Sequence, residues 1–231
     1  MSEVSRLRGE GRWDEALELV DDPLARADLL NEQALFAGSG EARAAAEREL
    51  DRAEARLLLG RGRVLHARFL AERAEDPREF ELFEQGLGLA RASGDDALTA
   101  EGLLWVGIVH QVVRGDDETS QPFFERSYTL ARELGDRKLM SYAVRHLGFV
   151  HHNGGRAEEA WAAFEESLTL RRKERFFPGV AAALHALGEA AAEQGRPDDA
   201  RRLLAEARGL AEQTGAVAFL ARIDAVLETL P

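Results

Sequence analysis

The chain has 231 residues, of which 45% are hydrophobic and 31% are charged, so it can bury a sizeable core. Its 42 acidic and 30 basic side chains give a formal net charge of -12, which disfavours direct binding to nucleic acid. The absence of cysteine excludes disulfides, thiolate metal sites and a cysteine nucleophile. No apolar run approaches the roughly 20 residues of a membrane span, and no signal-peptide core precedes the first helix, so we expect a cytoplasmic protein without membrane contact.

The first third of the chain predicts helices with a weak repeat pattern. The segment Gly11-Arg12-Trp13-Asp14-Glu15-Ala16 has the turn-plus-helix pattern of the later segment 155–160. Three helical segments follow, over residues 25–37, 41–58 and 63–74, with breaks predicted at Gly38-Ser39-Gly40 and at Gly60-Arg61-Gly62. Residues 1–62 are therefore expected to form degenerate helices at the start of a larger array.

From residue 63 the sequence repeats with a period near 40. Leu89, Leu130, Leu170 and Leu210 follow one another at spacings of 41, 40 and 40 residues. We attribute the longer first spacing to one extra residue in the turn at residues 115–117. A repeat of this length, made of helix-forming residues, indicates a solenoid in which each unit buries its apolar face against the next.

The last full unit indicates that each repeat is a hairpin of two helices. One helical stripe comprises Val180, Ala183, Leu184, Leu187, Gly188 and Ala191. A turn at Gly195 follows, and a second helix is predicted from about Asp198. We expect regular repeats over residues 63–213 and a capping helix over residues 216–230, within one domain spanning residues 1–231.

The ends of the second helices carry a glycine signal with one exception. Gly94 and Gly135 stand where a left-handed residue ends a helix. Arg175-Phe176 replaces this pair one repeat later, so we expect a local irregularity after residues 171–173.

These residues resemble the tetratricopeptide repeat (TPR), whose first helix carries a leucine-glycine pair and whose second helix carries alanine, a bulky aromatic and a small residue. Here these positions hold Leu147-Gly148, His151, Ala160, Phe164 and Ser167. The 40-residue period is similar to that of the long-period arrays in kinesin light chains, polarity adaptors and large bacterial transcriptional regulators. The resemblance implies an all-α, right-handed superhelical solenoid of antiparallel helix hairpins, with first helices that line a concave groove for peptides or partner helices.

The resemblance also implies which residues line the groove. They are Glu101, Leu104, Ile108, Gln111, Tyr142, Arg145, Phe149, His152, His185 and Glu189. Aromatic side chains, a fixed cation and a titratable ring are typical of a peptide-binding hot spot. One TPR subgroup binds C-terminal carboxylates through lysine, asparagine and arginine, but Phe149 and Glu189 occupy a position that this subgroup gives to asparagine. A clamp of that kind is therefore not predicted.

Histidines are concentrated on the predicted first helices, which raises the question of a metal site. They are His110, His146, His151, His152 and His185. Because His151 and His152 point about 100° apart on a helix, no pair has the i, i+4 spacing of a metal-binding helix. We predict no metal, no cofactor and no catalytic residue, since no motif of a nucleotide loop or a serine nucleophile is present.

The sequence favours a noncatalytic adaptor or scaffold that binds a neutral or basic protein or peptide segment in the groove. Two alternatives remain open. The chain could be a ligand- or peptide-sensing regulatory module that acts on a DNA-binding partner, or an enzyme that uses the histidine-containing concavity, with His152, His185, Glu189 and Tyr142 as acid-base groups. Homo-oligomerisation is possible, and the partner and the pathway are open.

Overall fold

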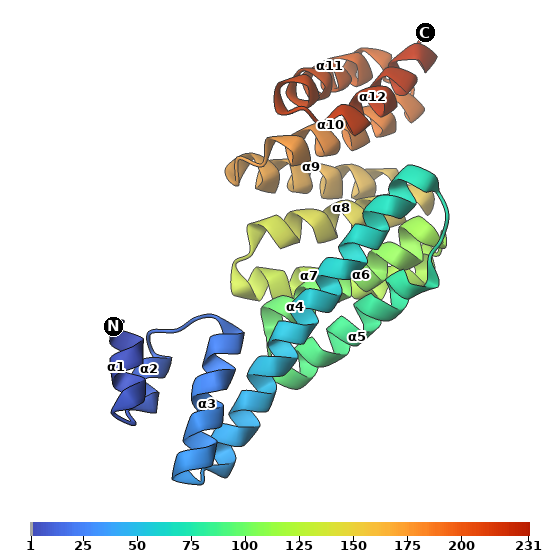
Figure 1. Cartoon of the computed structure of the whole chain (residues 1–231). Coiled ribbons are helices and arrows are strands. Elements are labelled where there is room, and N and C mark those ends of the chain that lie inside the picture. The colour runs from blue at the N-terminus through green and yellow to red at the C-terminus, as the bar shows by residue number, and fades with distance from the viewer. Residues whose placement is uncertain (1) are drawn as a thin grey trace. The chain divides into compact units, whose positions relative to one another are not determined.

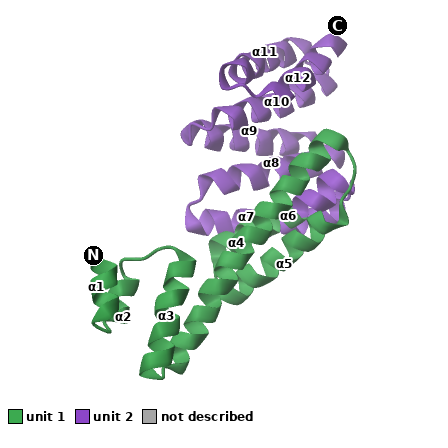
Figure 2. Cartoon of the chain, viewed as in Figure 1, with its two compact units in different colours: residues 1–106 green, residues 107–231 purple. Residues whose placement is uncertain are grey.

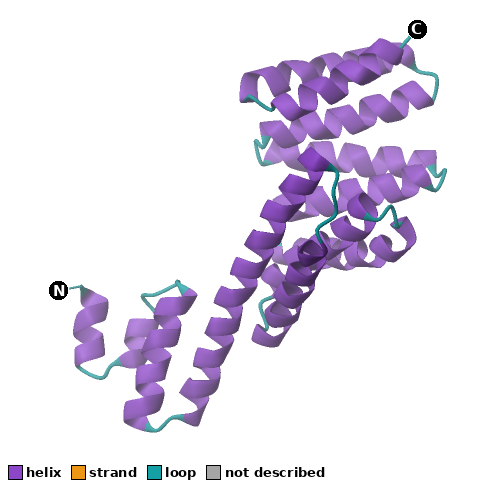
Figure 3. Cartoon of the chain, turned by 45° about the vertical axis from the view of Figure 1, so that its right-hand side comes forward, coloured by secondary structure: helices purple, strands orange, loops and turns teal. Residues whose placement is uncertain are grey.

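The structure, a computed structural model, describes residues 2–231 of the chain. Over these residues it contains helices and no strand, as the sequence predicted (Figures 1 and 3). The chain divides into two compact units, residues 1–106 and residues 107–231 (Figure 2). A single domain over residues 1–231, as the repeats suggest, stays a prediction.

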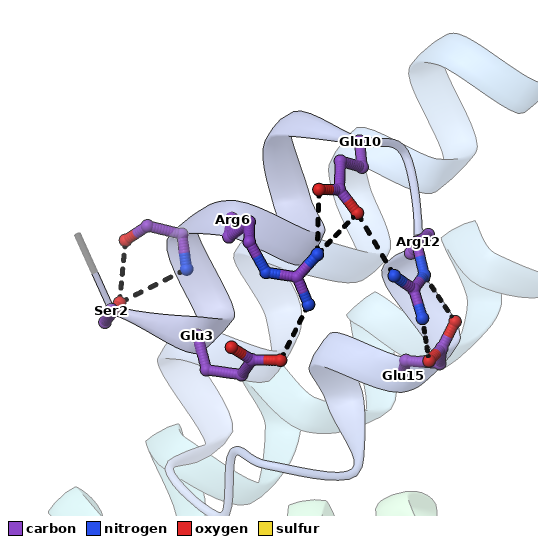
Figure 4. A network of polar contacts seen from close by, with 7 residues as sticks. Ser2, Glu3, Arg6, Glu10, Arg12 and Glu15 are labelled. Atoms are coloured by element: carbon purple, nitrogen blue, oxygen red, sulfur yellow. Dashed lines mark hydrogen bonds and ion pairs between the residues drawn. The ribbon is translucent and has the colours of Figure 1, made fainter.

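Unit 1 contains the first five helices and most of the sixth. They are α1 (Glu3–Gly9), α2 (Trp13–Leu17), α3 (Pro23–Ala37), α4 (Gly40–Glu72), α5 (Pro77–Ser93) and α6 (Asp96–Ile108). Around α1 and α2, arginines and glutamates form a surface network in which Arg6 bridges Glu3 and Glu10, and Arg12 bridges Glu10 and Glu15 (Figure 4). Because these pairs are exposed to solvent, they add little to the stability of the fold.

Unit 2 is a stack of helices in which each packs on the next in chain order (Figure 1). They are the π-helical segment η1 (Val109–Val113), α7 (Asp117–Leu134), α8 (Arg137–Asn153), α9 (Ala157–Lys173), α10 (Phe177–Glu193), α11 (Pro197–Thr214) and α12 (Val217–Thr229). The predicted stripe of α10 is buried, and its core includes Ala181 and Ala186 as well. None of the helices over residues 2–231 is both long and apolar enough to cross a membrane.

Close packing of helix pairs depends on one glycine in each hairpin. A Cβ atom at Gly148 would lie 2.5 Å from Cε1 of the buried Phe164, and one at Gly107 would lie 2.6 Å from Cε1 of Phe124. Gly188 faces Leu204 in the same way. Glycine at this position lets the first helix approach the bulky side chain of the second, which is the packing that the TPR pattern implies.

Helix α4 runs without interruption through Gly60-Arg61-Gly62, so the break predicted there is wrong. Gly62 is a packing glycine, because its Cβ would lie 2.5 Å from Cε1 of Phe83 on α5. Glycine inside a helix costs roughly 1 kcal/mol relative to alanine, but here it permits the contact with the Phe83 ring.

The 41-residue spacing has a different origin from the one predicted. Gly115 lies eight positions after Gly107, whereas Gly155 lies seven positions after Gly148, and both Gly115 and Gly155 have a left-handed φ. The turns are therefore equivalent, and the extra residue is accommodated in η1, where the Arg114 amide donates to the Val109 carbonyl. A π-helical turn is the usual way for a helix to absorb one added residue.

The expected irregularity after residues 171–173 is confirmed. Arg175 adopts a φ of 53°, at the point where other second helices end in glycine. The buried Arg171 supports this connection, because its Nη1 donates to the Gly179 carbonyl at 2.8 Å.

Helix α8 begins with an aspartate cap. Oδ1 of Asp136 accepts a hydrogen bond from the Leu139 amide at 2.9 Å. We expect Asp136→Ala to lower the free energy of unfolding by about 1 kcal/mol, because one amide of the first turn loses its acceptor. Urea titration followed by circular dichroism measures the change. Asp136→Asn keeps the cap, so an equal loss in that variant would contradict this explanation.

Candidate functional site

The first helices of unit 2 bring polar and aromatic side chains around one cavity. Phe149 and His152 come from α8, Glu189 and Glu193 from α10, and Arg222 from α12. The cavity has a volume of about 230 Å³. Its full lining is Phe149, His152, Asn153, Phe164, Ala186, Glu189, Ala190, Glu193 and Arg222. We call this surface, together with Tyr142 and Arg145, the first-helix face. The predicted groove residue His185 is 0% exposed and lies beneath this face.

An aromatic pair forms the apolar part of the cavity. Phe149 meets Phe164 edge to face, with ring centroids 5.0 Å apart. The guanidinium of Arg145 lies 4.6 Å from the centroid of the Phe149 ring. Phe149 is therefore held between the core and a cation, and it presents a fixed apolar surface.

Arg145 is a half-buried cation that forms no ion pair with the described residues. Its Nε is buried and has no hydrogen-bond partner. Burial, followed by repulsion from Arg171 and Arg222, lowers the pKa of Arg145 to about 9, although the Glu189 carboxylate acts in the opposite direction. A buried N–H donor without an acceptor is costly, so Nε of Arg145 lowers the stability of the fold.

Arg171 differs from Arg145 because its hydrogen bonds are satisfied. It is 2% exposed, donates to the Gly179 carbonyl, and lies 4.9 Å from the centroid of the Tyr142 ring. Burial lowers its pKa to about 10. Tyr142 is therefore positioned by a structural arginine.

Two histidine-glutamate pairs occur here, one between α8 and α10 and one within α10. Nε2 of His152 lies 2.9 Å from Oε2 of Glu193. Nδ1 of His185 lies 3.1 Å from Oε2 of Glu189, but these two atoms are not aligned for a hydrogen bond. Burial would raise the pKa of Glu189, but His185 and the nearby arginines outweigh it and lower that pKa. Glu189 is therefore ionised at neutral pH.

The predicted groove residues of α6 and η1 are placed differently. Leu104 and Ile108 are 2% and 4% exposed, and Glu101 pairs with Arg63 within unit 1. Gln111 donates to Oδ1 of Asp117 at 2.8 Å and lies 2.6 Å from Nδ1 of His146. These four residues do not line the cavity, and their part in a longer groove stays a prediction.

Arg222 was not among the predicted groove residues, because residues 216–230 were expected to form only a capping helix. A signal was present: Arg222 lies seven positions after Gly215, as Tyr142 lies seven positions after Gly135, and both glycines have a left-handed φ. Helix α12 is therefore equivalent to a first helix of the next repeat. Its side chains extend the face formed by α8 and α10.

The histidines of the first helices are used in packing and pairing. His110 stacks on Phe123 with centroids 5.6 Å apart, and His146 stacks on Phe124 at 5.0 Å. Across residues 2–231, no group of three or more His, Asp and Glu side chains is placed to hold a metal ion.

The comparison with protein families matches residues 139–213 to the tetratricopeptide repeat. No curated protein matches the chain.

Among solved structures, the chain is similar to aspartyl phosphate phosphatase F from Bacillus subtilis, with 13% identity, a TM-score of 0.54 and coverage of 87% of this chain. The chain spans 59% of that phosphatase. It is also similar to BtubC (BKLC) from P. vanneervenii, with 13% identity, a TM-score of 0.51, and coverage of 92% of this chain and 78% of that one.

A third similar structure, a Podosopora anserina putative kinesin light chain with nearly identical TPR-like repeats, has 19% identity, a TM-score of 0.46, and coverage of 92% of this chain and 93% of that one. At such low identities the shared property is the fold. The chain is a helical solenoid of the tetratricopeptide type, with the repeat family itself recognised over residues 139–213.

Proposed function

We propose that the first-helix face of unit 2 binds a peptide or an extended protein segment and that the chain acts as a noncatalytic adaptor. The observation that carries the proposal is the cavity between α8, α10 and α12. Its volume of about 230 Å³ lies below the roughly 300–1,000 Å³ of pockets for whole small ligands, and suits one side chain of a larger partner.

The chemistry of the face favours a neutral or basic segment. Phe149 and Phe164 offer apolar surface, and the carboxylates of Glu189 and Glu193 stand beside it. A side chain with an apolar stem and a cationic or hydrogen-bond-donating end would match this lining. The net charge of -12 favours a basic partner at longer range.

Arg145 and Arg222 have a separate role in this proposal. Their guanidinium groups donate hydrogen bonds and need acceptors, and the main-chain carbonyls of an extended segment provide them. The face would then hold the segment by its backbone and select one side chain through the cavity. The state of Arg145 supports this, since the side chain is half-buried on this face and forms no ion pair, so a bound segment could supply an acceptor.

The proposal is tested by selecting peptides from a random display library against the full chain. Selected peptides are then measured by calorimetry with His152→Ala and Arg222→Ala. We expect each variant to weaken binding by about tenfold or more, equivalent to about 1.4 kcal/mol, because each removes one polar group at the cavity.

Arg201→Ala serves as the matched control, since Arg201 is exposed on the second helix α11. It removes one positive charge, as Arg222→Ala does, and should leave the affinity unchanged. Equal affinities in all three variants, at unchanged melting temperatures, would place binding outside the first-helix face.

The two alternatives give different outcomes in the same experiments. A change of oligomeric state on peptide binding would favour a sensing module that acts on a DNA-binding partner. Turnover abolished by His185→Ala or Glu189→Ala would favour an enzyme. The noncatalytic reading is preferred because His185 is fully buried, so it cannot contact a substrate without rearrangement. The cytoplasmic location stays a prediction.

A further inference from the structure

Helix α4 of unit 1 carries a stripe of exposed apolar side chains. Leu50, Leu57 and Val64 are 50%, 54% and 65% exposed, and they follow one another at seven-residue intervals. The small residues Ala53, Gly60 and Ala67 stand three positions after each of them. Large and small apolar residues thus alternate at the a and d positions of a heptad pattern.

This stripe is separate from the core contacts of α4. The helix buries Ala42 and Ala46 in the cluster that contains Leu30 of α3, and Leu59, Gly62 and His66 are buried farther along. Beside Val64, a groove of about 490 Å³ between α4 and α5 extends the apolar surface. Its lining residues are Arg61, Val64, Leu65, Arg78, Glu81, Leu82 and Gln85. A contiguous exposed apolar strip of this kind is typical of an interaction surface.

Charged residues along one edge of the stripe also repeat every seven positions. They are Glu47, Glu54, Arg61 and Arg68, all exposed. Three other charges on α4 are paired within unit 1: Arg52 with Glu49 and Asp95, and Arg63 with Glu101. None of the four edge charges forms an ion pair with another residue in the described range 2–231. The edge is acidic in its first half and basic in its second half.

We propose that this face of α4 binds α4 of a second copy of the chain in antiparallel orientation. In that arrangement Leu57 packs against Gly60 of the second copy, Leu50 against Ala67, and Val64 against Ala53. Each large side chain faces a small residue, which lets the helices approach closely. Glu54 then stands opposite Arg61 of the second copy, and Glu47 stands opposite Arg68.

The parallel orientation is disfavoured by the same charges. Across a parallel seam, Arg61 would stand beside Arg56 and Arg68 beside Arg63 of the other copy, and no edge glutamate would meet an arginine. The antiparallel orientation also places Arg56 opposite Arg63, at two symmetric points, but its Glu47–Arg68 and Glu54–Arg61 pairs supply four attractive contacts. The charge pattern therefore favours a second copy in the antiparallel direction, while the short stripe predicts a micromolar rather than a nanomolar dimer.

Sedimentation velocity of the full chain, from about 1 to 100 μM, tests the proposal through charge reversal. The wild-type chain is expected to dimerise with rising concentration. Glu54→Arg and Arg61→Glu should each weaken the dimer about tenfold or more, because each places two like charges in contact at two symmetric points. The double variant E54R/R61E restores both pairs and should recover most of the wild-type affinity.

Glu84→Arg is the matched control, since Glu84 is exposed on α5 and the substitution changes the net charge as Glu54→Arg does. A wild-type chain that stays monomeric over the whole range would overturn the proposal and leave the stripe to a different protein. A double variant no better than the single variants would overturn the antiparallel pairing.

Cysteine cross-linking tests the direction independently, since the natural chain contains no cysteine. A mixture of Ala53→Cys and Val64→Cys chains is expected to form a disulfide-linked heterodimer under mild oxidation, and neither variant alone should do so. Efficient cross-linking of Val64→Cys with itself would instead indicate a parallel pair and contradict the proposal.

Discussion

Replacing Phe164 by alanine is expected to lower the free energy of unfolding by about 3–5 kcal/mol, because the ring is 1% exposed and fills the space between α8 and α9. Gly148→Ala should cost about 1–3 kcal/mol, since the new methyl group would overlap that ring. In the double variant the small residue at 164 leaves room for the methyl group at 148. The double variant should therefore lose clearly less free energy of unfolding than the two single variants lose together.

Urea unfolding followed by circular dichroism measures all three variants. Gly209→Ala is the control for the change in helix propensity, because a Cβ at Gly209 on α11 has no neighbour within 4 Å. That variant should be neutral or slightly stabilised. Additive losses in the double variant would show that Gly148 and Phe164 do not act as one packing pair.

Replacing Arg145 by methionine is expected to stabilise the chain, on the order of 1–3 kcal/mol, while weakening peptide binding at the first-helix face. Methionine keeps the packing on Phe149 and removes the buried Nε donor, which has no acceptor. A gain in stability together with a loss of binding is typical of a residue kept for function.

Urea titration followed by circular dichroism measures the change in stability. Arg201→Met is the matched control, because the same change at an exposed position should stay within about 0.5 kcal/mol. If Arg145→Met destabilised the chain as Phe164→Ala does, the guanidinium would have a partner in solution, and the proposed role of Arg145 would be wrong.

The repeat pattern was readable in the sequence because helix-hairpin packing is nearly the same in each repeat. The apolar stripe of α10 and the glycine opposite a bulky residue recur at fixed spacings, and these local signals led to the all-α solenoid. The left-handed glycines that end the second helices, and the irregular Arg175, followed from the same local chemistry.

Other features depend on neighbours that are distant in the sequence, and only the tertiary structure decided them. Gly60-Arg61-Gly62 continues a helix because Phe83 packs onto Gly62, although glycine pairs favour a break locally. The stacking of α8, α10 and α12 brings Phe149, Glu189 and Arg222 to one cavity. The same stacking leaves Nε of Arg145 without a hydrogen-bond partner. The sequence by itself thus determined the repeating unit, because helix periodicity and capping are local. Burial and charge pairing are set by contacts between repeats, so the tertiary structure decided which side chains remain available to a partner.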